Sequence, residues 1–497
     1  MSWWKSPRTF PLRIFMVALI VRLVPIVVMR NLGIGLDDMY QYDMLARSIE
    51  SGNGYRWYAK ADLPTVLPYL NLDFTSTNYD PRGMLTSFRP PLYPTFLALI
   101  YFVFGAGANR FFFARMVQAV LAASLAPITY ALAQRLFPNQ DPAARISAWV
   151  ITLYPLLVIY PLSLATENLF FVLFLCSILA LLKAKESLGI MSAIKIKISS
   201  FIYGVRWFII SGVLLGLTCL TRSVAQAFAL LAVLWVWLFL RERWKAFIVL
   251  FMAGMVVLPW IVRNSIINRQ FTGIETALGY DLYLGYNPKG TGTFQYPQSL
   301  DLMTIVTDTQ RNNVGIQDTI GFVKSDPGRI FYLFVRRAGY FFGLERRALT
   351  YFYSNDFFGH VSTPLLSGIF ALFCLPFIII SITGISTLPL ITRPKETWLI
   401  LLFFIGYITP HLLIIAEDRL HLAIVPLLAI LAAQFWSGNR STIRGLWLKS
   451  MSGKISLILA SVAILLFLLN WGIELWFDAD KLALLFGPNG NHTYFSY

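Results

Sequence analysis

The sequence predicts an all-α polytopic membrane protein with a bundle of about eleven transmembrane helices, and three observations support this fold class. Of the 497 residues, 57% are hydrophobic and only 13% are charged, whereas charged residues make up about a quarter of soluble domains. The mean hydropathy is +0.64. Apolar runs of membrane-spanning length recur from residue 12 to residue 477. The composition therefore excludes a soluble globular protein.

The first predicted element is an apolar stretch that runs to about Asn31, and Lys5, Arg8 and Arg13 lie ahead of it. Basic residues flank the cytoplasmic end of a span, and no small-residue cleavage site follows. We therefore expect a retained first transmembrane helix with the N-terminus in the cytoplasm. Arg22 lies near the middle of this helix, where an arginine costs roughly 3 kcal/mol, so it should face the bundle interior and find a partner.

The run at 92–104 decides the topology of the rest of the chain. Its residues would rise only about 20 Å as a helix, against a hydrocarbon core of roughly 30 Å. If it crossed the membrane, most basic loop residues would face outward, against the positive-inside rule. We expect it to lie along the outer interface. The eleven spans are then the first stretch and the runs at 111–135, 146–163, 168–182, 207–221, 224–240, 246–262, 363–387, 397–416, 420–436 and 455–477.

These spans divide the chain into four parts, in which both long polar stretches face the extracytoplasmic side. Within the loop region, aromatic residues alternate with arginines from Arg329 to Arg347, which predicts an amphipathic helix on the outer interface or a packed lid helix. Gly212 and Gly216 form a small-xxx-small pair typical of close helix packing. The parts are an N-terminal transmembrane module at 1–263, whose outer loop at 32–110 holds juxtamembrane helices, a mixed extracytoplasmic loop region at 264–360, C-terminal transmembrane helices at 361–477 and an outer tail at 478–497.

Four arginines sit at predicted outer ends of spans, contrary to the usual distribution of charge. Several guanidinium groups that converge beside hydrocarbon suit a phosphate or pyrophosphate on a lipid, such as a polyprenyl phosphate or a phospholipid headgroup. For any one of them, an arginine that only reaches the interface from a helix end is an equally open interpretation. The four are Arg89, Arg222, Arg263 and Arg419.

Carboxylates join these arginines on the same face. Asp37 and Asp38 follow the first span, and Glu167 opens the fourth. Because the runs at 168–182 and 207–221 would reach only about 22 Å, we expect Glu167 to be recessed in a water-filled outer cavity. A carboxylate beside a phosphoester can act as a general base, an effect worth about 10²–10⁴-fold. For the aspartate pair, a helix N-cap is the structural alternative.

The residues around Asp38 resemble a family signature. The stretch from Asp38 to Arg47, followed by Gly52–Tyr55, resembles the D-E-x-x-Y-x-x-x-A-R segment and Gly-rich turn after the first span of GT-C membrane glycosyltransferases. The nearest branches are the lipid A aminoarabinose transferases and the protein O-mannosyltransferase-like enzymes of glycosyltransferase family 39. Asp38 takes the catalytic aspartate position and Tyr42 the tyrosine position, while Met39 replaces the usual acidic neighbour. Later matches follow in order: Phe88–Pro94, Thr166-Glu167, Leu220–Arg222, Trp260–Asn264, Leu284–Pro288, and Arg419–His421 with Pro426.

The resemblance implies a GT-C-type bundle and an enzyme that transfers a sugar from a polyprenyl-phosphate donor to a hydroxyl or amine of a lipid, glycan or protein, usually with inversion. Asp38 would be the catalytic base and Glu167 would assist it. The four arginines would bind the donor phosphate. The implied place is the outer face of a bacterial plasma membrane. The remaining substrate-positioning candidates are Asp37, Tyr42, Tyr93 and His421.

No cofactor, metal or nucleic-acid partner is expected, and a Mg²⁺ or Mn²⁺ ion between Asp38 and Glu167 is the minority interpretation. The sequence contains no HExxH, CxxC pair, P-loop or GxGxxG, so zinc catalysis, ATP hydrolysis and nicotinamide chemistry lack support. Two alternatives stay open. An O-antigen-type ligase or polymerase also has many spans and a large outer loop. A lipid-linked sugar flippase or transporter would favour internal inverted repeats, which we do not see in this sequence.

Overall fold

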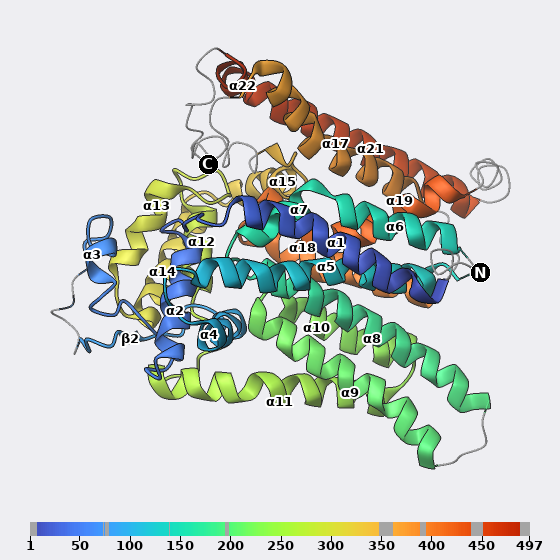
Figure 1. The fold of residues 1–497 in the computed structure, drawn as a ribbon, viewed down its shortest axis with the longest axis horizontal. Helices are drawn as coiled ribbons and strands as arrows, with labels where there is room; N and C mark the ends of the chain where they lie inside the picture. Colours follow the sequence, from blue (N-terminus) through green and yellow to red (C-terminus); the bar gives the residue numbers. More distant parts are fainter. Residues whose placement is uncertain are drawn as a thin grey trace.

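The computed structural model describes residues 7–72, 74, 79–138, 140–193, 198–346, 361–387, 394–438 and 451–487. The regular secondary structure of these residues is helical, apart from one antiparallel pair of short strands, β1 (Arg56–Trp57) and β2 (Met84–Leu85). In Figure 1 the long helices run beside one another along the long axis, and the elements of the two long polar stretches gather at one end of this bundle. The architecture confirms the predicted all-α fold class.

The bundle contains all of the long apolar helices. In the N-terminal part they are α1 (Phe10–Val28), α5 (Arg110–Leu136), the bent pair α6 (Asp141–Leu153) and α7 (Pro155–Ile159), α8 (Glu167–Ala193), α9 (Ile198–Thr221), α10 (Ala225–Leu234) with the π-helical turn η4 (Trp235–Phe239), and α11 (Arg243–Asn268). In the C-terminal part they are α17 (Thr363–Thr387), α18 (Pro394–Leu413), α19 (Val425–Ser437) and α21 (Met451–Phe477), followed by the short α22 (Ala479–Leu485).

Seven helices among the described residues are long and apolar enough to cross a membrane, or eight if the α6–α7 pair, bent by 57°, counts as one span. The protein is therefore an integral multi-pass membrane protein. Shorter apolar helices cover Leu92–Phe104, Val205–Thr221, Ala225–Phe239 and Val425–Ser437. The total of eleven spans and their orientation stay predictions.

The expected shortness was wrong for one of two spans, since Glu167–Gly189 is long and apolar enough to cross a membrane, whereas the apolar part of α9, Val205–Thr221, is short. α8 has 27 residues and α9 has 24, so these helices rise about 40 Å and 36 Å. Each helix is longer than its apolar run because it also includes charged residues such as Lys183 and Lys185 in α8, which are good helix formers. Helix length therefore gives no reason to place Glu167 below the interface.

The remaining elements come from the two polar stretches, and residues of both stretches pack into one buried core of aromatic and aliphatic side chains. Asp308 ties the two stretches together, because its carboxylate accepts hydrogen bonds from the Thr86 hydroxyl (2.7 Å) and the Ser87 N–H (2.6 Å) and pairs with Arg311 (3.0 Å). The elements are α2 (Asp38–Glu50), α3 (Leu63–Val66), α4 (Leu92–Phe104), α12 (Leu278–Tyr286), α13 (Tyr296–Asp301), α14 (Asp308–Ser325) and α15 (Arg329–Phe341).

The partner of Arg22 is the broken helix pair α6–α7. Its guanidinium donates to the carbonyl oxygens of Ile151 (2.9 Å), Thr152 (3.2 Å) and Ala18 (3.1 Å). Pro155 lacks an N–H and begins α7, so carbonyls at the end of α6 lose their helical partners. Arg22 satisfies two of them, and it is fully buried as expected.

The outer end of α21 is fastened to the chain that follows α15. The Trp471 indole donates to the Phe342 carbonyl (2.9 Å), and Arg346 pairs with Glu474 (2.8 Å). Figure 1 shows α17 and α21 side by side along one edge of the bundle. The structure describes the predicted outer tail only as far as residue 487, so residues 488–497 of that part lie outside the described residues.

Candidate active site

The start of α2 presents two adjacent aspartates in different roles. Asp37 is the N-cap, and its carboxylate accepts the Met39 N–H at 2.9 Å. Asp38 is the first helical residue and forms an ion pair with Arg89. Carboxylates are stabilised at a helix N-terminus, so the cap interpretation holds for Asp37. Asp38, with 37% of its side chain exposed, remains accessible.

Arg89 and Tyr42 pack against each other beside Asp38. Arg89 also donates to the Gln41 amide oxygen (2.9 Å), and its guanidinium lies 5.7 Å from the Tyr42 ring centre. Tyr42 meets Tyr93 edge-on at 5.1 Å, and the Tyr93 hydroxyl donates to Gln118 at 2.5 Å. Tyr93 therefore packs against the Tyr42 ring and holds it in place.

A second ion pair lies at the start of α8. Glu167 Oε1 is 2.5 Å from Arg222 Nη1, and the Thr166 hydroxyl donates to Glu167 Oε2 at 3.0 Å while accepting from Arg222 at 3.3 Å. The Glu167 side chain is only 4% exposed. Because its charge is neutralised and both oxygens have partners, Glu167 is an ionised carboxylate held in one position.

Arg419 approaches the Asp38 carboxylate oxygen that Arg89 does not contact. Its Nη2 lies 3.8 Å from Asp38 Oδ2, while Arg89 pairs with Oδ1. Its Nε lies 2.7 Å from Glu417, which holds the pKa of Arg419 well above its usual value. The side chain is 43% exposed. The Asp38 carboxylate thus lies between two guanidinium groups that come from distant parts of the chain.

Two carboxyl groups that the sequence analysis did not select accompany this group. Glu275, in the loop between α11 and α12, accepts a hydrogen bond from the Ser223 hydroxyl, next to Arg222. Burial raises the pKa of Asp281 to about 7, with a further contribution from the charge of Glu275, and Arg89 acts in the opposite direction. Both acids lie in the long polar stretch after α11. The sequence alone does not show the path of this stretch in space, so it does not show that Glu275 and Asp281 lie near Arg89.

Two predicted site residues lie elsewhere. Arg263 donates to the carbonyl oxygens of Thr86 (2.6 Å) and Tyr55 (3.3 Å) and stacks 4.5 Å from the Trp260 ring, so it braces the first outer loop. His421 is fully buried with its Nε2 2.9 Å from Glu345. The structure therefore brings together Asp38, Tyr42, Arg89 and Arg419 and shows the pair Glu167–Arg222, but it does not place Arg263 or His421 in contact with them.

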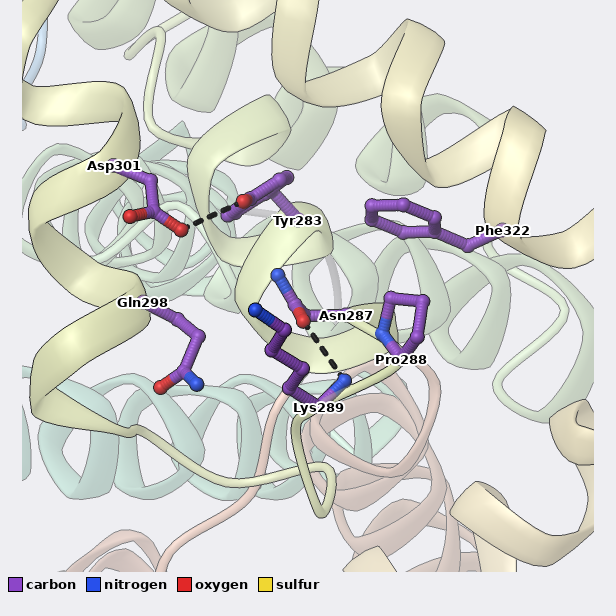
Figure 2. A pocket seen from close by; sticks show the side chains of 7 residues that line it. All are labelled: Tyr283, Asn287, Pro288, Lys289, Gln298, Asp301 and Phe322. Carbon is purple, nitrogen blue, oxygen red and sulfur yellow. Dashed lines mark hydrogen bonds between the residues drawn. The ribbon is translucent and has the colours of Figure 1, made fainter.

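A cavity of about 370 Å³ lies between α12, α13 and α14. Figure 2 shows the ring of Phe322 facing Tyr283, whose hydroxyl donates to Asp301 at 2.8 Å. Tyr283 follows Asp281 by two positions, about 200° around the helix, so this cavity opens on the other side of α12 from Asp281. The predicted water-filled cavity around Glu167 stays a prediction. The remaining lining residues are Asn287, Pro288, Lys289 and Gln298.

Among the described residues, no group of three or more His, Cys, Asp and Glu side chains is arranged to hold a metal ion. A dication between Asp38 and Glu167 would have to compete with Arg89 and Arg222 for their oxygens. The group as it stands offers guanidinium donors for an anion and one accessible carboxylate beside them. This is the arrangement required to bind a phosphoester and to accept a proton next to it.

No protein-family model and no curated protein matches this sequence. Solved structures do match. The oligosaccharyltransferase of Archaeoglobus fulgidus, in a complex with Zn and sulfate, has a TM-score of 0.51 and 14% identity over 98% of this chain and 57% of its own. The same protein tethered to an acceptor peptide containing the NVT sequon has a TM-score of 0.50 and 14% identity over 100% and 60%. ArnT from Cupriavidus metallidurans, bound to undecaprenyl phosphate, is less similar, with a TM-score of 0.40 and 13% identity over 89% and 80%.

The likeness to the archaeal oligosaccharyltransferase is a likeness of fold. It extends over nearly the whole of this chain, so the helices of this chain follow the fold of that protein. The chain spans 57 to 60% of the length of that protein in the two structures. The chemistry must therefore be argued from the residues of this chain.

Proposed function

We propose that the protein is a GT-C-type glycosyltransferase that moves a sugar from a polyprenyl-phosphate carrier to a hydroxyl or amine of a lipid, glycan or protein, with inversion at the anomeric carbon. The observation that carries the proposal is the Asp38 carboxylate between the guanidinium groups of Arg89 and Arg419. The shared fold with an oligosaccharyltransferase supports the reaction class. The apolar helices around the group support a lipid carrier.

The proposed reaction is a single displacement. The acceptor hydroxyl or amine gives its proton to Asp38 as its oxygen or nitrogen attacks the anomeric carbon of the sugar. The bond between that carbon and the phosphate oxygen breaks, and the phosphate takes the electron pair. Arg89 and Arg419 stabilise the charge that develops on the leaving phosphate. Their existing contacts with Asp38 keep donor and base within reach of each other.

In this proposal Glu167 and Arg222 form a rigid side of the substrate-binding site. The pair is buried and close, so Arg222 presents its remaining N–H groups in a defined direction. We assign Arg222 to the donor phosphate and Glu167 to the acceptor. Arg263 contributes only through its bracing contacts with the first outer loop. The proposed site faces the outside of a bacterial plasma membrane, with the N-terminus in the cytoplasm.

The test is to incubate purified protein with a polyprenyl-phosphate sugar and acceptor-containing membranes and to measure free polyprenyl phosphate. Asp38→Asn should lower its release by about 100-fold or more, because the base is lost while the side chain keeps its shape. Asp37→Asn is the matched control, since asparagine caps a helix as well as aspartate does. It should retain near-normal turnover.

Near-normal release by the Asp38→Asn variant would refute the base assignment. Absence of release by the wild-type protein, together with movement of the intact donor between leaflets, would point to a flippase. Release of a pyrophosphate carrier from a pyrophosphate-linked glycan would point to a ligase or polymerase.

A further inference from the structure

A buried hydrogen-bonded group of three polar side chains lies apart from the proposed site. Tyr154 precedes α7, Glu345 follows α15, and His421 lies in the 3₁₀ turn η7 (Asp418–Ala423). All three side chains are buried, with Glu345 and His421 at 0% exposure. The Tyr154 hydroxyl donates to Glu345 Oε1 at 2.5 Å. The group therefore joins three segments that are far apart in the sequence.

The geometry fixes the number of protons in this group. His421 Nδ1 is 2.8 Å from the Phe341 carbonyl oxygen, which can only accept, so Nδ1 carries a hydrogen. Nε2 is 2.9 Å from Glu345 Oε1. If Glu345 is ionised, Nε2 must also carry a hydrogen. If Nε2 carries no hydrogen, the Glu345 carboxyl must carry one for the two groups to form a hydrogen bond. In either case the pair holds one proton more than a neutral histidine and an ionised glutamate.

The surroundings favour retention of this proton. Burial raises the pKa of Glu345, and its Oε2 has no hydrogen-bond partner within the described part of the chain. An unpartnered oxygen costs less on a neutral carboxyl than on an ionised one. The Phe377 ring stacks on His421 at 3.8 Å, which excludes water from that face.

Other titratable and charged groups face the pair from each neighbouring element. Asp418 in η7 raises the pKa of Glu345 further. Arg346, next in sequence to Glu345, is paired with Glu474 of α21 (2.8 Å), so its charge is offset. The remaining two groups are Tyr154, which precedes α7, and the buried Cys374 of α17. These neighbours do not supply a cation that would replace the shared proton.

The turn that carries His421 also carries Arg419, two positions earlier. Besides the His421 contacts, the turn is held by the Tyr407 hydroxyl, which donates to the Leu420 carbonyl at 2.9 Å. The side chain of Arg419 leaves this turn toward Asp38. The position of the guanidinium therefore depends on the buried ring of His421.

We propose that Glu345 and His421 share one proton, and that this proton-bearing pair is a positioning device that locks the η7 turn and holds Arg419 next to Asp38. Loss of the proton in alkaline solution leaves an imidazole lone pair facing a carboxylate, which releases the turn. The consequence for binding rests on the proposed function, whereas the shared proton does not.

The first measurement is thermal unfolding of the purified full-length protein in detergent from pH 6 to pH 9. Above the ordinary histidine pKa of about 6.5 the unfolded chain lacks this proton, so the pair makes the unfolding constant rise by up to about tenfold per pH unit until the folded protein also loses the proton. In Glu345→Gln the amide can donate to a neutral His421 without an extra proton. The stability advantage of the wild-type protein over this variant should therefore shrink as the pH rises.

Tyr154→Phe is the matched control. It removes one hydrogen bond to Glu345 but keeps the pair, so its unfolding midpoint should be lower than that of the wild-type protein with the same pH dependence. If Glu345→Gln does not fold, His421→Gln replaces it, since this change also removes the shared proton. Unfolding curves of the wild-type and proton-free variants that keep a constant separation from pH 6 to pH 9 would overturn the proposal.

The second measurement is binding of undecaprenyl phosphate, used as the probe, over the same pH range. We expect the wild-type affinity to fall as the pH rises, and the fall in Glu345→Gln to be at least threefold smaller. Failure of the probe to bind at any pH would count against the proposed carrier, and the unfolding data would still decide the shared proton. If the unfolding data show the shared proton but binding of the probe depends on pH equally in both proteins, the positioning role is refuted.

Discussion

At the residue scale, the charged group around Asp38 shows which roles a short motif can reveal. Asp38 and Tyr42 could be selected because the segment that holds them resembles a family signature, and the structure places them together with Arg89. Asp37 caps α2, as the structural alternative predicts, and its part in positioning substrate stays a prediction. Glu275 and Asp281 could not be selected, because their proximity to Arg89 depends on the path of a long outer loop.

The raised pKa of Asp281 gives a prediction at the same scale. Its pKa of about 7 lies above the ordinary value because burial disfavours the charged form. A group with a raised pKa stabilises the folded state below its ordinary pKa, near 4, and this contribution is lost as the pH rises through 7. Asp281→Asn mimics the neutral form. We therefore expect the variant to unfold at a higher temperature than the wild-type protein at pH 8.5, and by a clearly smaller margin at pH 5.

The measurement is the unfolding midpoint of the two proteins in detergent at these two pH values. Asp301→Asn is a suitable control, because Asp301 lies on the far side of α12 and its carboxylate accepts from Tyr283. This control should not gain stability at high pH. An Asp281→Asn variant that tracks the wild-type protein at both pH values would contradict the burial of the ionised group.

At the element scale, some helices have the same bounds as the apolar run that predicted them, and others are longer than that run. The predicted run at 92–104 is a helix with the same bounds, α4, because Pro91 precedes it and Gly105 ends it with a positive φ of 86°. No such boundary residue follows the apolar run of α8 or precedes that of α9, so α8 continues to Ala193 and α9 already begins at Ile198. Boundaries were predictable where local chemistry ends a helix.

Close packing of α9 against α11 gives a second prediction. A Cβ atom at Gly212 would lie 2.5 Å from the Val249 carbonyl oxygen and 2.7 Å from the Met252 Cβ. Gly212→Ala should therefore force these helices apart and destabilise the protein by about 1–3 kcal/mol. Gly254 lies on α11 with no atom within 4 Å of an added Cβ. Gly254→Ala should leave stability unchanged or raise it by up to about 1 kcal/mol, since alanine favours helix.

Unfolding midpoints of the two alanine variants check this prediction directly. Equal effects at positions 212 and 254 would show that the α9–α11 contact is looser than its geometry implies. A lower midpoint for Gly212→Ala alone would confirm that the small-xxx-small pair is a packing contact.

At the scale of the whole molecule, the fold class followed from hydropathy because every span must satisfy its backbone hydrogen bonds internally. The site did not follow in the same way. Asp38, Arg89 and Arg419 come together only when α2, the segment before α4 and η7 are assembled. Spacing in the sequence does not determine such contacts.

The predicted orientation can be tested with cysteines at opposite ends of the bundle. Arg82, with 62% of its side chain exposed, lies in the first outer loop, and Arg243 is exposed at the start of α11. We expect a membrane-impermeant maleimide to label Arg82→Cys but not Arg243→Cys in intact spheroplasts of the host cell, and both after permeabilisation. The wild-type protein is the control for its native cysteines. The reverse labelling pattern would place Asp38 in the cytosol and end the proposed mechanism.

The hydrogen bonds of Arg22 affect how the protein is made. Two of its three acceptors lie 129 and 130 residues later in the chain, and ribosomes add about 5–20 residues per second. The arginine is therefore synthesised roughly 6 to 26 s before Ile151 and Thr152 exist. During that interval the first helix carries an unsatisfied cation that is costly in lipid. Biogenesis thus requires either that the translocon shelter this helix or that it enter the bilayer together with α6.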